Sequence, residues 1–145
     1  AVVVTTLTFG QSTADRHQQV EDAVRVHQEN DVAVAFGLAT SNILNALLLG
    51  QPLYKALEAE TILEGVDHPL VGQAVQDAYT ARNTPLEATA VARGRSCHLP
   101  ESFIIPLQAC LRASDSQVGN TDEPRYAVAV RENLLAAGDE CSRAI

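Results

Sequence analysis

Apolar residues recur at three- and four-residue intervals along most of this chain, the spacing that gathers them on one face of an α-helix. The longest such run covers residues 31–49, which Asn30 or Asp31 can cap and Gly50 can end. Its apolar stripe consists of Val32, Phe36, Ala39, Ile43 and Leu47. Alanines and leucines beside the stripe make it wider than the apolar face of a surface helix. We therefore expect residues 31–49 to form the central and most buried helix.

Six shorter segments show the same helical spacing, and they cover residues 14–27, 52–60, 69–82, 86–92, 100–111 and 125–137. In the fifth of these, Pro106 predicts a helix that begins near this residue or is kinked there. Residues 1–8 are rich in β-branched side chains and form a short strand on propensity alone. Residues 113–123 have the composition of a loop. The predicted fold class is all-α, with helices that pack closely because alanine recurs in each of them and Trp and Met are absent.

The chain of 145 residues carries 18 acidic and 10 basic side chains. This balance argues against a nucleic-acid partner, because backbone phosphates are bound by clustered Lys and Arg. Lys55 is the single lysine, and no basic amphipathic face suits an anionic membrane. Polar residues interrupt the apolar run of residues 32–49, which makes it a poor membrane span. The three cysteines show no CxxC spacing, so we expect reduced thiols in an intracellular, cytoplasmic protein.

The most concentrated chemistry lies close to the last residue of the chain. Gly138 can end the helix of residues 125–137, and Asp139 can cap the first amides of a following helix. Cys141 and Ser142 lie within one turn of Asp139, near the positive end of that helix. Such a cluster can bind a cation or an anion, although propensity alone favours a capping role for Asp139. We expect Asp139 and Ser142 to face a pocket.

Two histidines have a structural interpretation beside the functional one. His27 stands near the end of a predicted helix, where an imidazole more often interacts with the helix dipole than with a ligand. Cys97 and His98 pair a nucleophile with a base, but adjacent residues rarely point at each other and nothing identifies a third, orienting group. No catalytic residue is assigned.

Three segments resemble motifs of one protein family and occur in the same order as in that family. They are residues 24–37 (VRVHQENDVAVAFG), residues 94–103 (GRSCHLPESF) and residues 133–144 (NLLAAGDECSRA). The last segment is similar to the NLGGDTDT-like ending of the ADP-ribosylglycohydrolase fold family, and more closely to the GGDNCSRA of its J1-crystallin-like branch. The resemblance covers roughly residues 20 to 145. It implies an orthogonal multi-helix bundle.

The resemblance implies hydrolysis of an ADP-ribosyl glycosidic bond with the help of Mg²⁺. Asp139 matches a family ligand of an Mg²⁺ pair, whereas Cys141 stands where the family has a second aspartate and Ser142 where it has a threonine. His27, Gln28 and Asn30 are the substrate-binding candidates, because the family often has a Thr-His pair before an asparagine. The implied ligand is an ADP-ribose-type small molecule or an ADP-ribosylated acceptor.

Two departures from the family favour an incomplete site. A thiol is a soft ligand and suits Mg²⁺ poorly, so Cys141 weakens one metal position. No acidic Thr-Asp-Asp-like segment occurs in residues 1–30, although the family carries one in its N-terminal half. We therefore expect residues 1–145 to be the C-terminal part of a single domain, inactive as it stands, with apolar helix faces that meet a missing N-terminal half. The alternative is a non-catalytic, J1-crystallin-like structural or ligand-binding protein.

Overall fold

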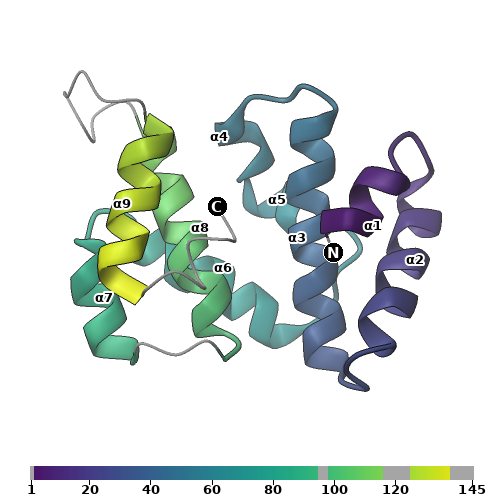
Figure 1. The fold of residues 1–145 in the computed structure, drawn as a ribbon, viewed down its shortest axis with the longest axis horizontal. Helices are drawn as coiled ribbons and strands as arrows, with labels where there is room; N and C mark the ends of the chain where they lie inside the picture. The colour runs from purple at the N-terminus through teal and green to yellow at the C-terminus, as the bar shows by residue number, and fades with distance from the viewer. Residues whose placement is uncertain (1, 95–97, 116–124, 138–145) are drawn as a thin grey trace. The chain divides into compact units, whose positions relative to one another are not determined.

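The computed structural model describes residues 2–94, 98–115 and 125–137. Within these ranges the chain forms nine helices and no strand, which confirms the all-α class (Figure 1). The helices are α1 (Val2–Leu7), α2 (Thr13–Arg25), α3 (Asp31–Leu48), α4 (Leu53–Ala56), α5 (Ala59–Ile62), α6 (Pro69–Ala81), α7 (Leu86–Arg93), α8 (Glu101–Ser114) and α9 (Arg125–Ala137). They fall into two compact units, residues 1–71 and residues 72–145.

The prediction of a strand in residues 1–8 is wrong, because Val2–Leu7 is helix α1. Its buried contact with α3 is polar, since the Thr5 hydroxyl donates to Ser41 Oγ at 2.8 Å. The Thr8 amide donates to the backbone oxygen of Val4 at 2.9 Å and extends the helical pattern, and the Thr8 hydroxyl donates to the same oxygen at 2.9 Å. Strand propensity reflects packing on a pleated surface more than an intrinsic backbone preference, so packing on α3 overrides it here.

Helix α3 begins and ends where the sequence predicts. Asn30 is its N-cap, and Gly50 follows it with a φ of +80°, a conformation that favours glycine. Gly37 brings α2 close, because a Cβ atom at this position would lie 3.2 Å from Val24 Cγ2. Leu47, the last member of the predicted stripe, is 37% exposed, whereas its neighbour Ala46 is buried.

The single helix predicted for residues 52–60 is two short helices, α4 and α5. Glu58 separates them with an extended ψ of 139°. Leu57 and Ile62 are both buried, yet residues five apart on one straight helix point about 140° away from each other. The break at Glu58 lets both side chains enter the core of the first unit.

In the second unit, α7, α8 and α9 pack around one apolar cluster. Its members are Leu86, Ala90, Ile105, Ala109 and Ala136. Helix α8 begins at Glu101, so the alternative that it begins near Pro106 is wrong. Seven of its 14 residues are buried, against seven of 18 in α3. The prediction that α3 is the most buried helix is therefore wrong, because α8 has a larger buried share.

Helix α9 has the predicted bounds, 125 and 137. It turns Ala129, Asn133 and Ala136 into the core of the second unit, at the three- and four-residue spacing of one helical face. Asn133 is the exception on this face, because it is a polar residue with no exposed surface. The face nevertheless explains why α9 packs against both α7 and α8.

Candidate functional site

The predicted metal-site residues Asp139, Cys141 and Ser142 lie outside the described residues, as does Cys97. Their proposed roles stay predictions. His98, the neighbour of Cys97, is exposed. Among the described residues, the candidate sites lie at the corner between α2 and α3 and among the polar side chains buried in each unit.

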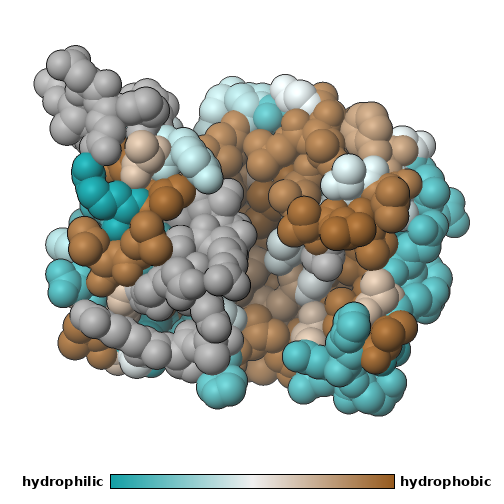
Figure 2. Space-filling view, in the orientation of Figure 1, coloured by the Kyte–Doolittle hydropathy of each residue, from teal (hydrophilic) through white to brown (hydrophobic). Residues whose placement is uncertain are grey.

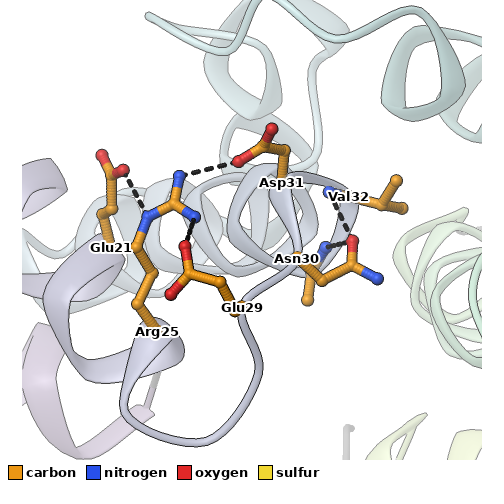
Figure 3. A network of polar contacts seen from close by, with 7 residues as sticks. Glu21, Arg25, Glu29, Asn30, Asp31 and Val32 are labelled. Carbon is orange, nitrogen blue, oxygen red and sulfur yellow. Dashed lines mark hydrogen bonds and ion pairs between the residues drawn. The ribbon is translucent and has the colours of Figure 1, made fainter.

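The three predicted substrate-binding residues lie together at the corner between α2 and α3, and all are exposed. The amides of His27 and Gln28 donate to the carbonyl oxygen of Val24, at 3.0 and 2.9 Å, and close the end of α2. Asn30 Oδ1 accepts hydrogen bonds from the amides of Val32 at 2.9 Å and Ala33 at 3.3 Å (Figure 3). The side-chain oxygen of Asn30 thus caps α3. Of its side-chain amide, the nitrogen Nδ2 is left for a ligand.

Arg25 holds this corner together through three carboxylates, as Figure 3 shows. Its guanidinium group donates to Glu21 at 2.8 Å, to Glu29 at 2.9 Å and to Asp31 at 2.7 Å. The hydrogen bond to Asp31, followed by the one to Glu21, raises the pKa of Arg25 above its ordinary value. Solvent screens exposed ion pairs such as these, so we expect their main effect to be on the direction in which α3 leaves α2.

The carboxylates at the corner do not form a metal site. In the part of the chain that the structure describes, no group of three or more His, Cys, Asp or Glu side chains is arranged to hold a metal ion. Glu21, Glu29 and Asp31 direct oxygens toward the Arg25 guanidinium instead. The ion pairs of the corner join α2 to the start of α3, and His27 is exposed between the two helices.

A buried polar cluster in the first unit escaped the sequence-based prediction. We call it the Asn42 cluster, and it consists of Arg16, His17, Asn42 and the backbone carbonyls of Ile62 and Glu64. Arg16 Nη2 donates to Asn42 Oδ1 at 2.9 Å, and His17 Nε2 lies 2.8 Å from the same oxygen. Asn42 Nδ2 donates to the carbonyl oxygens of Ile62 at 3.1 Å and Glu64 at 2.9 Å. One side chain of α3 thus joins α2 to the chain that follows α5.

The partners of Asn42 determine how its amide is oriented and how His17 is protonated. Both hydrogens of Nδ2 are used on carbonyl oxygens, so Oδ1 must face Arg16 and His17. His17 Nε2 must therefore carry a proton, because an amide oxygen only accepts. Gly65 packs on this imidazole, since a Cβ atom there would lie 3.2 Å from the His17 ring.

Arg16 is the least satisfied member of the Asn42 cluster. It is 2% exposed, and its Nε has no hydrogen-bond partner among the described residues. Burial lowers the pKa of Arg16, and the charge of Glu64 acts in the opposite direction. One signal for this residue was present in the sequence, because Arg16 lies four positions before the buried Val20 and so shares its face of α2.

In the second unit, Gln108 and Arg112 of α8 fix the turn between α6 and α7. Gln108 Nε2 donates to the carbonyl oxygens of Ala81 at 2.7 Å and Thr84 at 3.0 Å. Arg112 Nη1 donates to Thr84 O at 3.0 Å, and its Nε donates to Glu132 at 3.1 Å. These hydrogen bonds satisfy carbonyl groups at and after the end of α6, so we interpret the two side chains as structural.

Asn133 on α9 is the most unusual polar residue of the second unit. It begins the segment that resembles the family ending, and its side chain has no exposed surface. Neither its Oδ1 nor its Nδ2 has a hydrogen-bond partner in the described part of the chain. A buried amide without partners costs about 1–3 kcal/mol, so we expect Asn133 to lower the stability of the α9 packing.

Comparison with known proteins identifies no relative: the chain matches no family model, no curated protein and no solved structure. Helix α3 has the length of a membrane span and a mean hydropathy of 1.4, and 44% of it is buried within the protein. A helix in the core of a protein has these properties too. The ring of hydrogen bonds around Asn42, in the middle of α3, ties this helix to α2.

Proposed function

We propose that this chain belongs to an ADP-ribosylglycohydrolase-like domain and that the 145-residue protein does not itself hydrolyse ADP-ribosyl bonds. The observation that carries the second part is the corner between α2 and α3. There the residues that the resemblance assigns to substrate binding close α2 and cap α3. The all-helical fold is what such a domain would require, and the described part of α9 reaches Ala137, two residues before Asp139 in the sequence.

The available donor set does not fit an Mg²⁺ pair. Mg²⁺ takes oxygen ligands in octahedral geometry, and Asp139 and Ser142 supply oxygen while Cys141 supplies sulfur. The carboxylates at the α2–α3 corner are ion-paired with Arg25. We therefore derive no chemical step that passes through a metal ion.

A non-catalytic, J1-crystallin-like protein is the second candidate, and the use of Asn30 favours it. Its Oδ1 accepts from two backbone amides, which serves the stability of α3 rather than ligand binding. Cys141 in place of an aspartate favours the same candidate. Within this second candidate, a structural protein would not bind ADP-ribose, whereas a ligand-binding protein would.

Isothermal titration calorimetry separates the candidates and tests the proposal. Mg²⁺ and ADP-ribose are titrated separately and together into the wild type and into Asp139→Ala. We expect no saturable Mg²⁺ binding, because too few oxygen ligands are available. ADP-ribose binding without Mg²⁺ would identify a ligand-binding domain of this family, and the absence of binding would identify a structural one. Tight Mg²⁺ binding that Asp139→Ala removes would overturn the proposal.

Asn30→Ala and Asn30→Ser form a matched pair for the same titration. Serine can still cap α3, whereas alanine cannot. If Asn30 contacts ADP-ribose through its amide nitrogen, both variants lose affinity. If Asn30 only caps the helix, Asn30→Ser keeps the affinity and Asn30→Ala loses stability alone, by about 1 kcal/mol.

A further inference from the structure

Helix α9 buries little apolar surface for a helix of 13 residues. Among its described side chains, those that are buried belong to Ala129, Asn133 and Ala136, which are two methyl groups and one amide. Val128 and Val130 are half-buried. The neighbouring helix α8 instead buries four large aliphatic side chains, which are Ile104, Ile105, Leu107 and Leu111. The apolar contacts that hold α9 are therefore weaker than those that hold α8.

The largest aliphatic side chains of α9 are turned toward solvent. Leu134 is 45% exposed and Leu135 is 68% exposed, and Figure 2 shows apolar surface in brown over this helix. A leucine in a core stabilises more than an alanine does, because it removes more apolar surface from water. Helix α9 has this contribution available in its sequence and does not use it for packing on α7 and α8.

The packed side of α9 also meets polar atoms that lack partners. Asn133 Oδ1 and Nδ2 have no hydrogen-bond partner within the described ranges, and the same holds for Thr89 Oγ1 on α7 and Gln108 Oε1 on α8. A buried polar group that has lost its water without gaining a partner destabilises the packed state. The amide of Asn133 regains water when α9 moves away, so Asn133 favours a detached helix.

An ion pair acts against this effect. Arg112 Nε on α8 lies 3.1 Å from Glu132 Oε2 on α9. Both side chains are largely buried, and Glu132 directly precedes Asn133 in the sequence. The attachment of α9 is thus a balance between this ion pair with a few small apolar contacts and the cost of the buried amide.

We propose that α9 detaches from α7 and α8 as one cooperative segment while α8 stays folded. Segments with few buried apolar contacts have the smallest free energies of local opening in a folded protein. The second unit then has a closed form, which is the one described above, and an open form in which Asn133 is hydrated. Asn133 is the residue that sets the ratio of the two forms.

Native-state hydrogen exchange of the whole chain, followed by NMR at several low urea concentrations, tests the proposal. We expect the amides of residues 129–136 to share one opening equilibrium and to exchange at least about tenfold faster than the most protected amides of α8, after correction for intrinsic rates. Low urea should accelerate exchange in α8 and hardly affect α9, because a local opening exposes less surface than unfolding does.

Two substitutions should move the exchange of α9 in opposite directions. Asn133→Leu should slow it about 5- to 30-fold, because leucine suits the closed form and is unfavourable in water. Glu132→Gln should accelerate it about two- to fivefold, because it removes the ion pair with Arg112. The matched control is Leu135→Ala on the exposed side of α9, which should change the rate by no more than about twofold.

Two results would overturn the proposal. If α9 and α8 exchange at the same rate and with the same dependence on urea, α9 opens only when the whole unit unfolds. If Asn133→Leu leaves the exchange of α9 unchanged or accelerates it, the buried amide does not favour opening. Circular dichroism checks that each variant folds, and Glu132→Gln decides in the same way if Asn133→Leu does not fold: an unchanged or slower exchange of α9 would contradict the proposal.

Discussion

Replacing Asn42 by leucine tests the Asn42 cluster with a side chain of similar shape. The change removes an acceptor from Arg16 and His17 and leaves the carbonyl oxygens of Ile62 and Glu64 without a donor. Neutral hydrogen bonds contribute about 1 kcal/mol each and bonds to a charged group about 1.5–3 kcal/mol. Arg16 would remain buried without its hydrogen bond to Asn42, which adds to the cost.

We expect Asn42→Leu to lower the free energy of unfolding by about 3–5 kcal/mol, a large part of the roughly 5–15 kcal/mol of an ordinary domain. Urea unfolding followed by circular dichroism measures it. Asn45→Leu is the matched control, because Asn45 lies on the same helix, is half-buried and makes no side-chain hydrogen bond within the described residues. Its effect should stay within about 0.5 kcal/mol.

The double variant Arg16→Met/Asn42→Leu completes the test. Removing the buried guanidinium together with its acceptor should restore part of the lost stability, because no buried donor is then left without the acceptor that Asn42 supplied. A loss below about 1 kcal/mol for Asn42→Leu, or a loss equal to that of Asn45→Leu, would refute the reasoning.

Three further predictions concern the second unit. Asn133→Leu should raise the free energy of unfolding by about 1–2 kcal/mol in a urea titration, since it removes two buried polar atoms that have no partner among the described residues. A decrease would show that Asn133 has a partner or ligand. Burial acts to raise the pKa of Asp77, but hydrogen bonds from Gln73 and Arg93 and the charge of Arg93 lower it overall. The pairing of Asp77 therefore stabilises the fold above the unfolded pKa of 3.8, and this stabilisation is lost as pH falls through the folded pKa. Asp77→Asn should lower the free energy of unfolding by about 0.2–1 kcal/mol at pH 7 and leave it unchanged at the lowest pH. An equal cost at both pH values would contradict this prediction. Burial raises the pKa of the Cys110 thiol to about 11. In a variant whose other two cysteines are replaced by serine, alkylation of the folded protein at pH 8 should be at least about tenfold slower than alkylation of the protein unfolded in urea. Equal rates would contradict the burial of Cys110.

Local patterns predicted much of the helical framework. Asn30 and Gly50 mark the ends of α3 through capping chemistry that depends only on neighbouring residues. Residues 2–7 could not be predicted in this way, because β-branched side chains form a helix here only through packing on α3. The break at Glu58 likewise follows from the need to bury Leu57 and Ile62 together.

The polar chemistry of the fold was harder to predict than its helices. Asn42 appears in the sequence as an interruption of an apolar run, and its role depends on carbonyl groups 20 and 22 residues away. Its partner Arg16 bonds the oxygen of the same side-chain amide and lies 26 residues earlier in the sequence. A local pattern contains no information about such partners. Asn30 was predicted both as a cap and as a binding residue, and the geometry accounts for the cap.

A hydrolase assay tests most directly our proposal that this chain belongs to an ADP-ribosylglycohydrolase-like domain and does not hydrolyse ADP-ribosyl bonds by itself. ADP-ribose release from an ADP-ribosylated substrate is measured with excess Mg²⁺ for the wild type, Asp139→Ala and Cys141→Asp. We predict no release above the rate in buffer for any of the three, because restoring one oxygen ligand at Cys141 does not complete the site. Turnover by the wild type that disappears in Asp139→Ala would contradict the account, since it would show that this chain contains a complete site.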